Sequence, residues 1–238
     1  MIRVTVWNEF YHEQQEGEAK KLYPNGIHQV IADFLRCDDI AVRTATLEEP
    51  ECGLTQEVLD ETDVLIWWGH LRHDKVPDAV ADRVHQEILR GMGFICLHSG
   101  HESKVFQRLV GTTANVYWRE DGDYARLWVV DPTHPITKGI DRFVYVEEEE
   151  TYCEPFGIPQ PDELLFITAY EGGEVFRSGF TLYRQNGRIF YFQPGHETYP
   201  VYYNPQVQQV IRNAVYWANP VHRVKDVSSV HIEKLTAK

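Results

Sequence analysis

The chain has few cysteines, only four in 238 residues, and no C-x-x-C pair. They are far apart in the sequence, which argues against a disulfide framework or a cysteine-bound zinc. The N-terminus lacks a charged leader with an apolar core, and no apolar run reaches the length of a membrane span. These absences predict a reduced, cytoplasmic protein with no membrane partner.

Basic residues are also scarce: 23 Lys and Arg stand against 36 Asp and Glu, a formal charge of −13. This balance argues against nucleic acid or an anionic membrane surface as a partner and leaves a small molecule as the expected one. At 43% hydrophobic, the chain can bury one sizeable core. We expect a single domain over residues 1–238, with residues 220–238 as a C-terminal tail.

Apolar runs alternate with amphipathic segments in the first half of the chain, which is typical of a doubly wound, mostly parallel α/β sheet. Strands are expected at residues 3–7, 39–44, 63–68 and 94–97. In the second half, strands follow one another with little helix between them, which predicts added antiparallel strands. These are expected at residues 126–130, 143–146, 164–169, 175–184 and 189–192, before a last helix over 205–218.

Several of these apolar strands end abruptly in polar, chemically capable side chains. Because the carboxyl ends of parallel strands share one edge of a sheet, such groups gather there in α/β enzymes. We therefore expect one active-site cavity at this edge. The groups that follow the strands are Asn8, Glu9 and His12; His70; His98, Ser99 and His101; and His196 and Glu197.

Imidazoles from separate strand ends predict a divalent metal centre with an open position, for which zinc is the preferred ion. The expected ligands are His12, His70, His98 and His196, with His101 in reserve. The alternative for each one alone is a solvated or hydrogen-bonded loop histidine. For proton transfer we single out His98, Glu9 and Glu197, although Glu197 is equally well explained as a helix cap or a loop ion pair.

Aromatic and polar side chains near the same edge predict a sugar-binding surface. Trp68, Trp118 and Tyr152 are candidate stacking walls, although each aromatic taken alone is more often a core residue. The acidic run of residues 147–150 is typical of a solvated face, but it can supply one inward acid, and Glu150 is the candidate. Asn8 and Ser99 are further substrate contacts, and simple turn chemistry is the alternative for Asn8.

Five short motifs resemble the trehalose-utilisation, or ThuA-like, family of the class I glutamine amidotransferase-like superfamily. In that superfamily a G-x-C-x-G elbow carries the catalytic cysteine, and His98 stands at the position of that cysteine here. The similarity spans residues 3–218. The motifs are Tyr11-His12; Cys96-Leu97-His98-Ser99-Gly100; the D-P-x-H-P-I turn from Asp131 to Ile136; Glu149-Glu150-Thr151-Tyr152; and Gly195-His196.

The resemblance implies a flavodoxin-like fold and a cytoplasmic protein of disaccharide metabolism, with an oxidised (keto) sugar as one candidate substrate. The leading hypothesis is a metal-dependent enzyme that isomerises, cleaves or hydrolyses a sugar by His/Glu acid–base chemistry. The alternative is a non-catalytic sugar-binding or regulatory module that lost the nucleophile. A residual amidase that uses Cys96 is a third reading, which the apolar neighbours of this cysteine disfavour. Aromatic strands and the tail favour a homo-oligomer.

Overall fold

The computed structural model describes residues 1–234, and the last four residues of the predicted tail lie outside this range. The strands are β1 Ile2–Asn8, β2 Ile40–Thr46, β3 Val64–Trp68, β4 Gly93–Leu97, β5 Tyr117–Val129, β6 Phe143–Cys153, β7 Glu163–Tyr170, β8 Val175–Arg184 and β9 Gly187–Phe192. The helices are α1 Glu18–Leu22, α2 Ile27–Leu35, α3 Gln56–Asp60, α4 Asp78–Leu89, α5 Lys104–Val110 and α6 Pro205–Ala218.

All nine strands form one mixed sheet in the order β2-β1-β3-β4-β9-β8-β7-β5-β6. The first five strands of this order pair in parallel, and the remaining pairs are antiparallel. This confirms the predicted α/β sheet with added antiparallel strands in the C-terminal half. The order reverses between β1 and β3, the point at which open α/β sheets bind ligands.

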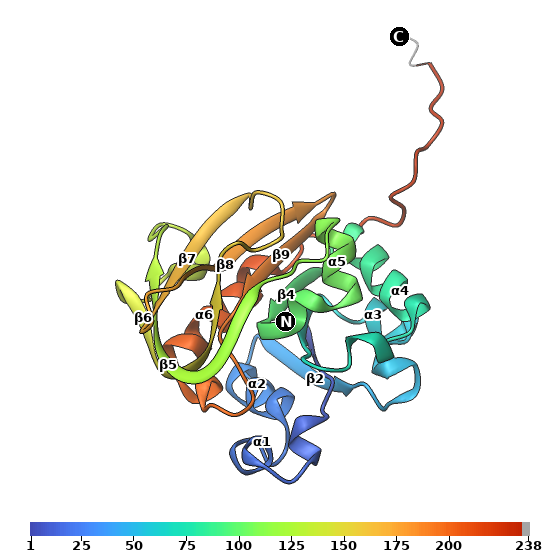
Figure 1. Cartoon of the computed structure of the whole chain (residues 1–238). Coiled ribbons are helices and arrows are strands. Elements are labelled where there is room, and N and C mark those ends of the chain that lie inside the picture. Colours follow the sequence, from blue (N-terminus) through green and yellow to red (C-terminus); the bar gives the residue numbers. More distant parts are fainter. Residues whose placement is uncertain (235–238) are drawn as a thin grey trace.

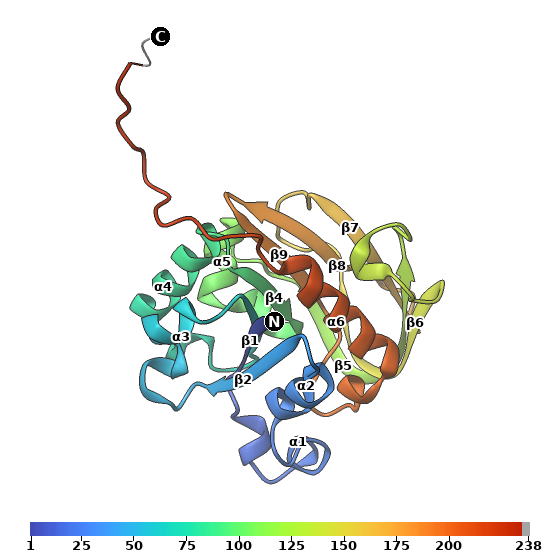
Figure 2. The ribbon, with the colours of Figure 1, turned by 180° about the vertical axis from the view of Figure 1, so that it is seen from behind.

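The central parallel strands are buried on both faces because helices cover the sheet from both sides. Every residue of β3 and β4 is buried, as their continuous apolar sequences require. Figures 1 and 2 show α2 and α6 together on one face and α4 with α5 on the other, and both pairs are in contact. The polar strand ends therefore lie beyond the core, at its edge.

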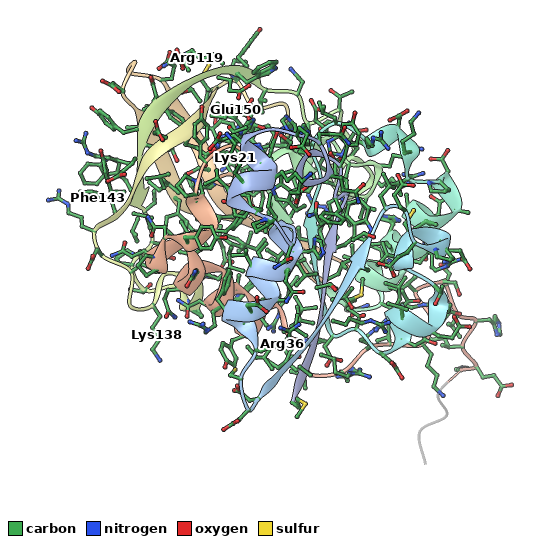
Figure 3. The ribbon with its side chains drawn as sticks, turned by 90° about the horizontal axis from the view of Figure 1, so that it is seen from below. Lys21, Arg36, Arg119, Lys138, Phe143 and Glu150 are labelled. Atoms are coloured by element: carbon green, nitrogen blue, oxygen red, sulfur yellow. The ribbon has the colours of Figure 1, made fainter. Side chains whose placement is uncertain are left out.

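Strands β5 and β6 are much longer than the sequence predicts. They form a ribbon from the Trp128–Phe143 pair to the Tyr117–Cys153 pair. Figure 3 shows Arg119 and Glu150 near one end of this ribbon and Phe143 near the other. Residues 117–125 include several charged residues and a glycine, and the register between β5 and β6 shifts twice. Apolar and polar residues therefore do not alternate regularly here, and the sequence gives no strand signal.

Within residues 220–234, the tail is attached to the domain near its start. Arg223 donates to the carbonyl oxygens of Leu59 and Thr62, at 2.8 and 2.9 Å, and the Val224 amide donates to the Arg90 carbonyl at 2.9 Å. The chain then runs away from the domain, as Figure 1 shows. Within residues 1–234, no helix has both the length and the apolar character of a membrane span.

The turn after β4 has the geometry of a nucleophile elbow, a sharp turn from strand to helix. His98 has φ of 51°, a left-handed conformation that non-glycine residues rarely adopt. A 3₁₀ helix, His98–Glu102, follows at once. At Gly100 a Cβ atom would lie 2.9 Å from Cys96 Sγ and 3.3 Å from the Trp67 carbonyl oxygen, so the turn needs glycine here.

We expect Gly100→Ala to lower the free energy of unfolding by about 1–3 kcal/mol, because the added methyl group overpacks the elbow against β3 and β4. Gly17→Ala is the matched control, since nothing lies within 4 Å of a Cβ atom there. Urea denaturation of both variants measures the difference. Equal stability of the two variants would show that the elbow tolerates a side chain.

Candidate functional site

Four predicted or suspected site residues meet at the carboxyl edge of the parallel strands. His70 follows β3, His98 follows β4 and His196 follows β9, whereas Glu150 comes from β6. One ligand atom from each lies within 4.8 Å of the other three. This set of three imidazoles and a carboxylate has the spacing of a metal-binding group, and we call it the central cluster.

His98 is held so that one ring nitrogen points into the central cluster. Its Nδ1 lies 3.1 Å from the Gln193 carbonyl oxygen, so Nδ1 carries the proton and Nε2 keeps its lone pair. The ring stacks between Trp68 and Tyr152, with interplanar angles of 11° and 22°. Within the described chain, neither Nε2 nor Glu150 Oε2 has a hydrogen-bond partner, although both are buried and lie 3.2 Å apart.

Glu197 joins the central cluster to a second group made of His12, His70 and Glu197. One carboxylate oxygen lies 3.0 Å from His70 Nδ1 and the other lies 3.1 Å from His12 Nδ1. The two imidazoles stack at a centroid distance of 5.0 Å. A carboxylate that accepts the Nδ1 proton fixes the imidazole so that Nε2 can act as a ligand.

His196 is positioned through its own loop and through β6. Its Nδ1 accepts the Thr198 backbone N–H at 3.3 Å and lies 2.8 Å from Thr198 Oγ1, so the proton of the neutral ring sits on Nε2. Glu149 accepts the backbone N–H groups of Gly195 and His196, at 2.7 and 3.2 Å, in addition to that of Glu150. The adjacent residues Glu149 and Glu150 therefore have different roles. Glu149 anchors the loop that carries His196, whereas the Glu150 carboxylate is part of the central cluster.

The protonation states follow from burial and from Glu197. Burial, followed by the charge of a neighbouring histidine, lowers the pKa of His98 to about 3 and that of His196 to about 4, so both are neutral near pH 7. Burial is the largest single influence and lowers the pKa of His70, but the hydrogen bond to Glu197 and the charges of Glu197, Glu150 and Glu9 together raise this pKa above its usual value. Burial would raise the pKa of Glu197, yet His70 and the surrounding imidazoles hold it below its usual range.

Glu9 and Asn8 are buried, and their polar atoms are engaged by the protein itself. The Glu9 carboxylate accepts the backbone N–H groups of His70, Leu71 and Arg72 at 2.8–3.0 Å. The Asn8 side chain accepts the Phe10 N–H at 2.8 Å, and its amide reaches Glu13 at 2.7 Å and His28 at 3.0 Å. These contacts favour the turn chemistry considered for Asn8 and a loop-positioning role for Glu9.

The other predicted residues surround a small pocket beside the central cluster. His101 donates from Nδ1 to the Ala114 carbonyl at 2.8 Å and is absent from both candidate ligand groups of the described residues. Ser99 Oγ lies 2.7 Å from the Tyr152 hydroxyl, and Trp118 is 65% exposed. The pocket has a volume of about 160 Å³, and its lining includes His70, Ser99, His101, Glu102, Glu150 and Tyr152.

Three buried residues extend the sequence-based description of the site. Cys96 is completely buried, and burial raises the pKa of its thiol well above the usual value, as expected of a core residue. Trp68 is also completely buried and donates to the Gly195 carbonyl at 3.0 Å, so its ring supports His98 from within the core. Glu149 was not predicted; the four-residue acidic run signalled an inward acid, but not that two adjacent carboxylates turn inward.

The comparison with protein families gives one match: the family model named ThuA, described as trehalose utilisation, matches residues 3–218. None of the curated proteins compared with the chain matches it. Among solved structures, a protein from Bacteroides uniformis described as ThuA-like superposes with a TM-score of 0.68 at 18% identity. The superposition covers 91% of each chain.

Two further structures show how widely the fold is shared. A cytoplasmic protein from Salmonella typhimurium has a TM-score of 0.60 at 11% identity, with 92% of this chain and 100% of that chain covered. PurLQS from Thermotoga maritima has a TM-score of 0.53 at 13% identity, with 91% and 98% covered. At these identities the similarity establishes the fold alone, which is the class I glutamine amidotransferase-like fold with its mixed sheet.

We expect Glu149→Gln to destabilise the fold by about 1–3 kcal/mol, because an NH₂ group would then face a backbone N–H that has lost its acceptor. The exposed neighbour provides the control, Glu148→Gln, which should leave stability within about 0.5 kcal/mol. Chemical denaturation measures both changes. If the two variants are equally stable, Glu149 does not anchor the loop after β9.

We expect the free energy of unfolding to fall as the pH drops from about 6.5 towards 4. Burial lowers the pKa of His28 to about 4 and that of His101 to about 3, so the unfolded chain takes up protons before the folded chain does. Each such histidine contributes at most ~1.4 kcal/mol per pH unit. Urea titrations across this range measure the slope, and His28→Asn should make it shallower; an unchanged slope would contradict this assignment.

Proposed function

The chain belongs to the ThuA (trehalose utilisation) family, and on this premise we propose that it is a metal-dependent enzyme that acts on a carbohydrate. The family description supports the substrate class. The central cluster supports the chemistry, because it gathers buried ligand atoms at the edge of the sheet where α/β proteins bind ligands. Membership in a family does not define a mechanism, so the mechanism is argued from the side chains.

The observation that carries the proposal is the buried pair formed by His98 Nε2 and Glu150 Oε2. Within residues 1–234, both atoms lack a hydrogen-bond partner, and a buried polar group without a partner costs about 1–3 kcal/mol. A cation between them would satisfy both at once. On the adjacent rings, Nδ1 of His70 is held by Glu197 and Nδ1 of His196 by Thr198, so Nε2 is the nitrogen that each would offer to a metal. His196 would first move its proton from Nε2 to Nδ1, where Thr198 Oγ1 can accept it.

The donor set fits a divalent ion of the first transition series, and zinc is our first choice. Three imidazole nitrogens and one carboxylate oxygen are common zinc ligands, whereas magnesium and calcium prefer oxygen ligands alone. When bound, the metal would polarise a sugar oxygen as a Lewis acid. His98 and His196 are neutral near pH 7, so they can accept a metal without first losing a proton.

We assign proton transfer to the group of His12, His70 and Glu197 rather than to Glu9. Glu197 stays ionised and bridges His12 and His70, so it can stabilise a proton on either imidazole. His12 is the outer member of this set, and its Nε2 is buried with no hydrogen-bond partner among the described residues. We propose that His12 exchanges the proton at Nε2 and that Glu197 orients it, which suits isomerisation, elimination or hydrolysis of a ketosugar.

Thiol chemistry is not part of the proposal. The elbow presents His98 where the superfamily carries its catalytic cysteine, and Cys96 is sealed in the core two residues earlier. We further propose that the protein works in the cytoplasm. All four cysteines are free, and the similar protein from Salmonella typhimurium is described as cytoplasmic.

We expect the protein, purified without an affinity tag, to contain about one zinc per chain, because the central cluster offers one set of ligand atoms. His98→Ala should lose the metal, and Glu197→Gln should weaken its binding about 10–100-fold by releasing His70. Elemental analysis and competition with a chelator measure both effects. His222→Ala is the matched control, because this exposed histidine belongs to neither ligand group.

Circular dichroism separates loss of metal from loss of fold in the His98→Ala variant, whose buried ring also packs against Trp68. A folded variant that keeps its zinc would contradict the proposed centre. Sugar binding that persists unchanged after chelation would favour the non-catalytic sugar-binding module instead. Turnover that disappears with the metal and returns when zinc is restored would support the enzyme.

A further inference from the structure

The pocket beside the central cluster is too small for a disaccharide. Its volume is about 160 Å³. Pockets that enclose drug-sized ligands measure about 300–1,000 Å³. A substrate of two sugar rings therefore has room to place only one of them beside the central cluster, and the other must lie outside.

The polar groups of the pocket suit neutral hydroxyls. Ser99 and Tyr152 present a pair of hydroxyl groups, and His101 has only Nε2 left to accept a hydrogen bond because its Nδ1 is used by Ala114. Glu102 and Glu150 add carboxylate oxygens. Acceptors of this kind pair with the O–H groups of a sugar.

The charge of the lining disfavours a phosphorylated substrate. Two glutamates line the pocket, and no Lys or Arg does so in the part of the chain that the structure describes. Sites that recognise phosphate use Arg or Lys side chains or the N-terminus of a helix. Glu102, which belongs to neither candidate ligand group, would instead repel a phosphate group.

The rim of the pocket carries apolar side chains that the fold leaves uncovered. Trp118 and Leu71 both line the pocket, and they are 65% and 60% exposed. Adjacent residues of a strand point to opposite faces, so Tyr117, which is 61% exposed and does not line the pocket, is directed away from it. An exposed indole beside a sugar-sized pocket is suited to stack on a ring that lies outside.

We propose that the pocket receives a single uncharged sugar ring, the terminal unit of a larger substrate, and that Trp118 binds the next unit outside the pocket. This inference rests on the proposed function, because it assumes a carbohydrate at the central cluster. It goes beyond that function by assigning the two sugar units to different places and by making Trp118 a determinant of specificity.

The test uses the metal-loaded full chain and ligand-observed NMR, which detects weak binding, with trehalose, methyl α-D-glucopyranoside and glucose 6-phosphate as probes. Trehalose and the methyl glucoside should bind, and glucose 6-phosphate should not. Trp118→Ala should weaken trehalose binding about two- to tenfold, the range expected for loss of one stacking contact, and leave the methyl glucoside unchanged. Tyr117→Ala is the matched control and should change neither.

The outcomes distinguish this inference from the proposed function. If both sugars bind but Trp118→Ala weakens them equally, or not at all, the two-place arrangement is wrong while the carbohydrate function stands. Binding of glucose 6-phosphate as tight as that of the methyl glucoside would overturn the neutral-ring assignment alone. If none of the sugars binds to the metal-loaded protein, the carbohydrate function itself is overturned, and the pocket assignment with it.

Discussion

The site depends on the contacts that join the two halves of the sheet, foremost that of the Glu149 side chain with the backbone of the loop after β9. The histidines come from the parallel strands, but the carboxylate of the central cluster comes from the antiparallel ribbon. This attachment helps to hold Glu150 Oε2 at 3.2 Å from His98 Nε2. By accepting the N–H groups of Gly195 and His196, Glu149 sets the position of β6 and of the last histidine together.

The parallel half of this arrangement could be predicted because its signals are local. Short apolar runs such as Val64–Trp68 are typical of buried strands in an α/β chain, and the polar residues that follow parallel strands are expected to share an edge. The central cluster bears this out for His70, His98 and His196. The fold class followed from the same alternation of strands and helices.

The antiparallel half was less predictable because its structure is set by distant contacts. Between the Ala125–Val146 and Asp123–Glu149 pairs, β6 contains one residue more than β5, so the inward and outward positions no longer alternate. A second register shift spans Glu150, and in this stretch the adjacent Glu149 and Glu150 are both buried. The sequence also did not predict the role of Glu9, whose carboxylate accepts three backbone N–H groups of the loop after β3. These donors are more than 60 residues away in the sequence, so only the folded structure identifies them.

The left-handed backbone at His98 has a consequence for how this architecture diversifies. A residue in that conformation projects its side chain to the same point above the sheet whatever its chemistry, because strand, turn and glycine fix the direction. Replacing a thiol by an imidazole there would exchange a covalent nucleophile for a group able to bind a metal, and would leave the scaffold intact. A substitution at this single position can therefore change the type of reaction that such a protein supports. The neighbouring strands must then supply the other side chains that the new chemistry requires.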